Sequence, residues 1–270
     1  MRRHPVPTVG FIVIVVLAAI SAVPSVFATS NPFTQHVEIA LARPSRHHFF
    51  GTDELGRDIY SRVIYGLRLT LLSGFSVVAI SAVLGGFLGL VAGLRGGIVD
   101  GLIMRLADMF LSFPALIMAI AIVSFLGRNL VNAMIAISLI WWPQYTRLLR
   151  GQVLAVRELP YIEAARSLGA RRRRIIFRYI LPNTLVPVLI KASVDFSYAI
   201  LITSSLSFLG VGAQPPSPEL GAMVTDGRVY LLTSWWYSTF PSLAIFIAVL
   251  SLNLVSDGIR DLLDPAVQVQ

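Results

Sequence analysis

Long stretches without charged side chains are the dominant pattern along this chain. Residues 5–37, 69–94 and 229–256 contain no Asp, Glu, Lys or Arg. A helix that crosses ~30 Å of hydrocarbon needs about 20 mostly apolar residues. We therefore predict an all-α, polytopic membrane protein with six transmembrane helices. The expected spans cover roughly residues 8–28, 69–94, 106–127, 130–148, 183–210 and 237–258.

The composition supports this class. Hydrophobic residues make up 56% of the 270 residues and charged residues 13%, and the mean hydropathy is +0.76. A soluble domain carries about 25% charged residues, so an ordinary soluble enzyme or a disordered chain is excluded. The absence of cysteine excludes disulfides, thiolate zinc sites and cysteine nucleophiles.

The first span has two interpretations. Arg2 and Arg3 precede an apolar stretch, and Val26-Phe27-Ala28 resembles a signal-peptide cleavage site. The segment is therefore either a retained span or a cleaved signal peptide, and both keep the start of the chain inside.

Arginine placement predicts the orientation. With the N-terminus inside, the inner segments hold 14 arginines and the outer segments hold 7. An excess of basic residues in short loops marks the cytoplasmic side. We expect a multi-pass protein of the cytoplasmic (inner) membrane with both termini in the cytoplasm.

Two features inside the spans indicate a packed bundle. Gly85, Gly89 and Gly93 recur every four residues, so they share a helix face that admits a close neighbour. Lys191 and Asp195 are also four apart and can pair. This pair, expected away from the centre of its span, either lines a translocation path or is a structural pair near the cytoplasmic boundary.

The segment between the fourth and fifth spans is the most basic part of the chain, with nine arginines and two glutamates between positions 147 and 178. Attraction to anionic lipid explains the charge but not the order of the residues. Pro160 suits the first position of a helix, Glu163 suits its first turn, and Gly169 suits its end. We predict a short helix over 160–169 that is suited to docking, and a second helical stretch over 172–180.

The same segment resembles the EAA motif of bacterial ABC-importer permeases. The resemblance implies the six-helix type I permease fold and a coupling helix that docks into an ATP-binding subunit. Tyr179 departs from the family pattern, which often has isoleucine or histidine there. The expected coupling residues are Glu163, Ala164, Ala165, Arg166, Gly169, Leu181 and Pro182.

Further segments sharpen the resemblance toward the C-type subunit of dipeptide and oligopeptide importers. The run 206–212 and the C-terminal residues around Asn253 are similar to that family, whereas Leu220 and Ser242 replace its usual tryptophan and glycine. A segment before the second span also matches. The members of this outer signature segment are Gly51, Thr52, Asp53, Gly56, Arg57 and Asp58.

The resemblance implies an assembly. The expected partners are a homologous second permease, two ATP-binding subunits, an extracytoplasmic substrate-binding protein, membrane lipid and a peptide substrate, but no nucleic acid. We expect two parts of the chain. Residues 1–68 would hold the N-terminal cytoplasmic tip, the first span and the outer segment. Residues 69–270 would form a five-span permease core with the cytoplasmic coupling loop at 149–182.

We expect no catalytic, cofactor or metal site in this chain. A P-loop needs a lysine between glycine and serine or threonine, and the only lysine, Lys191, follows Ile190 and precedes Ala192. ATP and Mg²⁺ would therefore be bound by partner subunits. His47 and His48 are expected to be a solvated pair. The alternatives are a permease for nickel or another small solute, an ion-driven secondary transporter, and an intramembrane enzyme.

Overall fold

The computed structural model describes residues 5–263, and this part of the chain is helical, with one isolated β-bridge between Thr52 and Asp58. The all-α prediction is therefore confirmed. The elements are α1 Pro5–Ala22, α2 Pro24–Phe27, η1 Val37–Ile39, α3 Ile59–Arg95, α4 Gly97–Leu111, α5 Ala115–Leu126, α6 Leu130–Arg157, α7 Pro160–Ser167, α8 Arg172–Ile175, η2 Ile176–Ile180, α9 Leu181–Phe208, α10 Leu220–Gly227, η3 Arg228–Tyr230 and α11 Trp236–Leu263.

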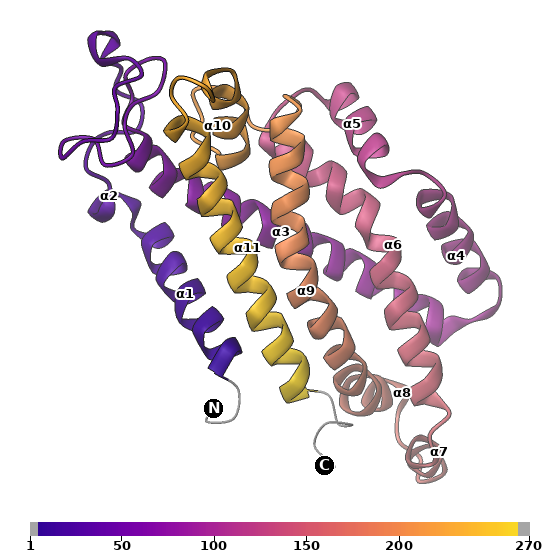
Figure 1. Ribbon diagram of the computed structural model, residues 1–270. Helices are drawn as coiled ribbons and strands as arrows, with labels where there is room; N and C mark the ends of the chain where they lie inside the picture. Colours follow the sequence, from indigo (N-terminus) through magenta and orange to yellow (C-terminus); the bar gives the residue numbers. More distant parts are fainter. Residues whose placement is uncertain (1–4, 264–270) are drawn as a thin grey trace.

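The long helices form a bundle (Figure 1). Helix α3 packs against α6 and α9, and α11 packs against α9 and α1. The connection between α2 and α3 lies with α10 at one end of the bundle, whereas α7 and α8 lie at the other. The beginning of α1 and the end of α11 are at the same end as α7 (Figure 1). The first described helix therefore begins, and the last one ends, at the end of the bundle that carries the basic loop.

By length and composition, three helices of the described chain can cross a membrane, namely Ile59–Arg95, Arg172–Phe208 and Trp236–Leu262. The first expected span is a shorter apolar helix, Pro7–Ala22, followed by the short α2. The fourth expected span lies within α6, which continues to Arg157.

The single span expected over 106–127 is wrong. The structure has two helices there, α4 and α5, bent by 92° at a short break. Pro114 precedes the first residue of α5. Proline has no N–H to continue a helix and disfavours helical backbone in the residue before it, so the chain bends at this point. The pair would supply one further, broken span.

The glycine prediction is confirmed by the contact between α3 and α6. A Cβ atom placed on Gly89 would lie 2.5 Å from the Thr146 carbonyl oxygen, and one on Gly93 would lie 2.7 Å from Val153. The Thr146 hydroxyl donates to the Gly85 carbonyl at 2.9 Å. These two helices are therefore held at backbone contact.

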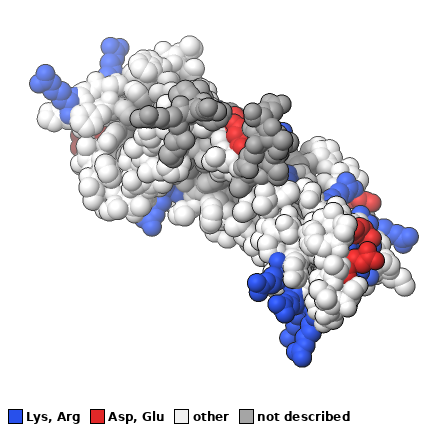
Figure 2. Space-filling model, turned by 90° about the horizontal axis from the view of Figure 1, so that it is seen from below, with Lys and Arg blue, Asp and Glu red and all other residues white. Residues whose placement is uncertain are grey.

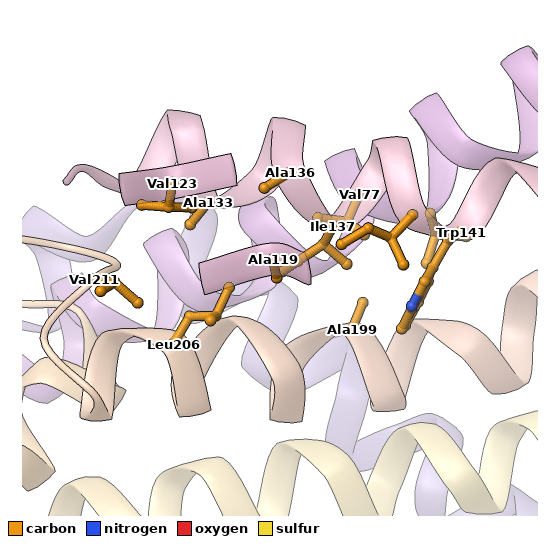
Figure 3. Close-up of a cluster of buried hydrophobic side chains, with 12 residues drawn as sticks. Val77, Ala119, Val123, Ala133, Ala136, Ile137, Trp141, Ala199, Leu206 and Val211 are labelled. Atoms are coloured by element: carbon orange, nitrogen blue, oxygen red, sulfur yellow. The ribbon is translucent and has the colours of Figure 1, made fainter. Parts of the chain in front are cut away.

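A cluster of buried side chains joins α3, α5, α6 and α9 (Figure 3). Small residues such as Ala119, Ala133 and Ala199 let these helices approach one another, and the larger Trp141 lies at one end of the cluster (Figure 3). Close packing of this kind makes the helices move as rigid elements.

Candidate functional site

Helix α7 is a short exposed helix attached to the bundle through one face. Pro160 occupies its first turn, as expected, because proline needs no hydrogen-bond acceptor there. Ile162 is fully buried and packs in a cluster with Tyr145 and Val188. Glu163 and Ala164 are exposed on the other side. The helix is therefore fixed at its base and free on its outer face.

The end of α7 has the geometry that its glycine predicts. Gly169 has a φ of +75°, which glycine adopts without the penalty that a side chain incurs. The Ala170 N–H donates to the Ala165 carbonyl at 3.0 Å, and the Gly169 N–H donates to the Arg166 carbonyl at 2.9 Å. These two bonds form a Schellman motif, which satisfies carbonyls at the end of the helix.

The chain after α7 returns directly into the bundle. The helical stretch expected at 172–180 is present, as the α-turn α8 followed by the π-helical η2. Leu181 begins α9 directly after η2, and Pro182 lies in the first turn of α9. The Asn183 amide donates to the Tyr179 carbonyl at 2.6 Å and to the Tyr161 hydroxyl at 3.4 Å, so α7 is tied to the start of α9.

Two arginines on either side of α7 contact the end of α3. The Arg157 guanidinium donates to the Gly93 carbonyl at 3.1 Å, and the Arg172 guanidinium donates to the Leu94 carbonyl at 3.3 Å. These carbonyls lie in the last turn of α3, where cations are favourable. No sequence pattern indicated this contact, because Gly93 and Leu94 are far from both arginines along the chain.

A cavity of about 560 Å³ lies beside α7. Its wall combines aliphatic side chains with three guanidinium groups, one of which pairs with the Glu158 carboxylate at 2.8 Å. The wall keeps an excess of positive charge, so it suits an anionic partner with an apolar part. Basic side chains project at this end of the molecule (Figure 2), where Arg171 and Arg174 are exposed. The lining residues are Leu94, Arg157, Glu158, Arg166, Ala170, Arg172, Ile175, Ile176 and Ile180.

Lys191 and Asp195 form the ion pair that their spacing predicts, with 3.0 Å between the Lys191 Nζ and an Asp195 carboxylate oxygen. The Lys191 ammonium also donates to the Gln144 side-chain oxygen at 3.0 Å. The two residues are the eleventh and fifteenth of the 28 residues of α9. The helix begins earlier and ends earlier than the expected span, so the pair flanks its middle.

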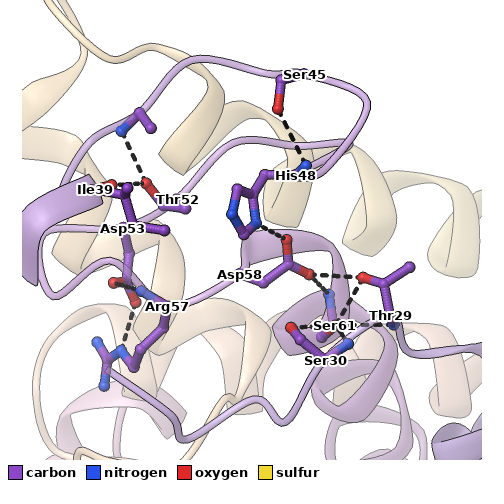
Figure 4. A network of polar contacts seen from close by, with 11 residues as sticks. Thr29, Ser30, Ile39, Ser45, His48, Thr52, Asp53, Arg57, Asp58 and Ser61 are labelled. Carbon is purple, nitrogen blue, oxygen red and sulfur yellow. Dashed lines mark hydrogen bonds and ion pairs between the residues drawn. The ribbon is translucent and has the colours of Figure 1, made fainter. Parts of the chain in front are cut away.

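The outer signature segment folds into a buried polar network at the opposite end (Figure 4). The Asp58 carboxylate caps α3 by accepting from the Ser61 N–H at 2.8 Å. The Asp53 carboxylate accepts from the Arg57 Nε at 2.6 Å, and both side chains are almost fully buried. Thr52 is also buried and donates to the Ile39 carbonyl at 2.5 Å. The network fixes the loop on the N-terminal start of α3.

Two glycines of this segment are required by its backbone. Gly51 and Gly56 have φ angles of +75° and +71°. A Cβ atom on Gly51 would also lie 2.6 Å from the Ala42 carbonyl oxygen, and one on Gly56 would overlap the His36 carbonyl oxygen. The structure therefore brings together all six residues that the sequence singled out here.

Two buried ionisable residues at the α10 end of the bundle are not among the six predicted members of the outer signature segment. Arg62 is 1% exposed and donates to the Pro32 carbonyl at 3.1 Å. Glu219 is fully buried and caps α10 by accepting from the Ala222 N–H at 2.9 Å. Burial raises the pKa of the Glu219 carboxyl. An acidic residue directly before an apolar helix is a capping signal that could have identified Glu219.

The prediction of a solvated histidine pair is confirmed for His47 and wrong for His48. His47 is exposed, but the His48 Nδ1 lies 2.9 Å from an Asp58 carboxylate oxygen and its side chain is 26% exposed (Figure 4). His48 therefore belongs to the network that caps α3. Within the described residues, no group of three or more His, Cys, Asp or Glu side chains is placed to hold a metal ion.

Comparison with known proteins gives a consistent result. Residues 85–269 match the family described as binding-protein-dependent transport system inner membrane component. The chain is 43% identical over 265 residues to the probable D,D-dipeptide transport system permease protein DdpC of Escherichia coli, covering 98% of this chain and 89% of that protein. It is 43% identical over 270 residues to the dipeptide transport system permease protein DppC of Alkalihalophilus pseudofirmus, covering 98% and 87%.

Solved structures support the fold. The inward-facing MetNI methionine ABC transporter aligns with a TM-score of 0.56 at 20% identity, covering 75% of this chain and 96% of that chain. At this level of identity the likeness concerns the fold alone.

Proposed function

The chain belongs to the family of binding-protein-dependent transport system inner membrane components, and from this premise we propose that it is the permease subunit of an ATP-driven importer of di- and oligopeptides. The relatives named as dipeptide permeases support the peptide substrate, because each covers almost the whole chain. Nickel or another small solute is the alternative cargo within the same architecture.

The observation that carries this proposal is helix α7. It is anchored by Ile162, while Glu163, Ala164 and Ser167 are exposed at one end of the bundle. The alanine allows close approach of a partner, and the neighbouring arginine-lined cavity can receive its acidic groups. This surface suits docking into a separate ATP-binding subunit, which would bind ATP and Mg²⁺ and carry out hydrolysis.

The contacts around α7 provide a route for the motion. A displacement of α7 acts on the end of α3 through Arg157 and Arg172, and on the start of α9 through Asn183. Because α3 packs at backbone contact on α6, the three helices would tilt together. Tilting of the bundle against a homologous second permease would alternate access to a central path between the two sides of the membrane.

The orientation follows from the same arrangement. The α7 end, with the start of α1 and the end of α11 beside it, would lie in the cytoplasm, where basic residues concentrate. The opposite end, with the outer signature segment and α10, would face the extracytoplasmic binding protein. Lys191 and Asp195 would lie near the middle of the membrane.

The test is an uncoupling experiment on the importer reconstituted with its ATP-binding subunits and binding protein. We expect Glu163→Lys combined with Gly169→Val to abolish peptide uptake while the complex still inserts. The matched control is Asp261→Lys combined with Gly101→Val, because Asp261 is exposed in the last turn of α11 and Gly101 has open space in α4. Full uptake by the α7 variant would contradict the proposal.

A further inference from the structure

We propose that Lys191 and Asp195, together with Gln144 and Tyr145, form a binding site for the two charged ends of a free peptide in transit. The Lys191 ammonium would bind the peptide carboxylate, and the Asp195 carboxylate would bind the peptide α-ammonium group. This inference rests on the proposed function and assigns to this chain a direct role in substrate recognition.

The four side chains converge between α6 and α9. The Lys191 Nζ lies 3.0 Å from Asp195 Oδ2 and 3.0 Å from Gln144 Oε1. It also lies 5.2 Å from the centre of the Tyr145 ring, which stabilises a cation. The ammonium is thus held by three neighbours, of which Asp195 carries the opposite charge and Gln144 and Tyr145 are neutral.

The position of the pair requires a polar environment. Both residues lie near the middle of an apolar helix, yet their side chains are 25% and 15% exposed on this chain, and Gln144 beside them is exposed. Charged groups that face hydrocarbon at this depth are costly, so such residues face a partner helix or a water-filled path. This face of α6 and α9 therefore lies toward the interior of the assembly.

The cluster retains unused hydrogen-bonding capacity. Tyr145 is fully buried, and its hydroxyl lies near Asp195 without a hydrogen bond of normal geometry to any described residue. A buried hydroxyl without a partner is unfavourable, and a ligand bound at Asp195 would supply one. This orphan hydroxyl is the independent sign that the cluster receives a further polar group.

The charges match those of a free peptide. The lysine–aspartate pair is neutral overall and so is a peptide with free ends and uncharged side chains. Exchanging the internal pair for two contacts with the peptide leaves no net charge within the membrane at any stage. The ends of a dipeptide are at most about 7 Å apart, a separation that the flexible lysine side chain can accommodate.

The exposed face of α9 continues from this site toward the outer end. Tyr198, Leu201, Ser205 and Phe208 recur at spacings of three and four, so they share one face, and each is exposed. The last three also line a cavity of about 250 Å³ together with α10 and α11. Tyr198 stacks on Trp141 at 5.7 Å beside the ion pair. The site is thus joined to the outer end by a continuous surface.

The experiment measures binding of three probes to the assembled transporter in nanodiscs without its binding protein. The probes are Ala-Ala, N-acetyl-Ala-Ala and Ala-Ala amide. We expect the wild-type complex to bind Ala-Ala at least tenfold more tightly than either blocked peptide. Lys191→Gln should abolish the preference over the amide and keep the preference over the acetylated peptide, and Asp195→Asn should do the reverse.

The double variant Lys191→Gln with Asp195→Asn keeps a hydrogen-bonded neutral pair and controls for the cost of an unpaired charge. It should bind all three probes equally. Unchanged discrimination in the variants, or equal loss of both preferences in each single variant, would overturn the inference while leaving the proposed function intact. A wild-type importer that takes up no peptide in proteoliposomes would instead contradict the proposed function and this inference with it.

Discussion

Arg157 and Arg172 lie on opposite sides of α7 in the chain, and both donate to carbonyl oxygens of the last turn of α3. The Arg157 Nη1 lies 3.1 Å from the Gly93 oxygen and the Arg172 Nη2 lies 3.3 Å from the Leu94 oxygen. The two ends of the exposed loop helix are therefore bound to a single neighbouring helix. A force applied to α7 by a partner would reach α3 through two charge-assisted hydrogen bonds.

Removing both arginine contacts should weaken the connection between α7 and α3. We expect Arg157→Gln combined with Arg172→Gln to reduce peptide uptake per ATP hydrolysed by about tenfold, since two charge-assisted bonds to α3, both partly exposed to solvent, are lost. The measurement is the ratio of uptake to hydrolysis in proteoliposomes. Arg174→Gln is the matched control, because Arg174 is exposed in the same loop. An unchanged ratio in the double variant would argue against this connection.

The backbone contact between α3 and α6 should tolerate no side chain at Gly89. We expect Gly89→Ala to lower the stability of the protein by roughly 1–3 kcal/mol, because its Cβ would lie 2.5 Å from the Thr146 carbonyl oxygen. Gly86→Ala is the control, since a Cβ there would meet only Leu149 at 3.7 Å. Thermal unfolding in detergent compares the two, and equal melting temperatures would contradict the close approach of the helices.

The end of α7 should depend on the left-handed backbone of Gly169. We expect Gly169→Ala to cost about 1 kcal/mol, since a residue with a Cβ is strained at a φ of +75°. Gly151→Ala in α6 should instead stabilise by about 0.5–1 kcal/mol, because this glycine has open space around it and helical surroundings. Hydrogen exchange of the α7 amides, or limited proteolysis of the loop, would detect the difference. A gain in protection for both variants would be inconsistent with this geometry.

The buried Glu219 carboxyl should make stability depend on pH. Because burial raises its pKa in the folded protein, the protonated form is favoured there. The stability that protonation supplies is present below the unfolded pKa of about 4.5 and is lost as the pH rises through the higher folded value. Asp226 has a pKa raised for the same reason, so the two effects add.

Glu219→Gln should therefore reduce, without abolishing, the fall of the melting temperature between about pH 4.5 and pH 8. Glutamine retains the side-chain oxygen that caps α10, so the change isolates the titration from the capping bond. Glu38→Gln is the control, because this side chain is 74% exposed. A variant with the same pH profile as the wild-type protein would show that Glu219 does not titrate in this range.

Local signals in the sequence accounted for much of the loop between α6 and α9. Pro160 and Gly169 each act on the backbone of their own residue, so the beginning and end of α7 could be predicted without any tertiary information. The spacing of Lys191 and Asp195 likewise predicted their pairing, since residues four apart on a helix are neighbours. The apolar runs predicted the class of the protein but not the bend at Pro114. Hydropathy measures how apolar a segment is and does not show where a helix changes direction.

The chain by itself determined that this is a helical membrane protein, where its loop helix begins and ends, and which glycines face a neighbour, because these depend on hydrophobic length, local backbone preference and helix periodicity. Only the tertiary structure decided which carbonyls Arg157 and Arg172 bind, that His48 joins Asp58, and that Glu219 is buried. The arginine and histidine contacts depend on which other residues the fold brings next to these side chains. The burial of Glu219 depends on the packing of other elements around its carboxyl group. No local pattern encodes how segments that are separated in the sequence meet.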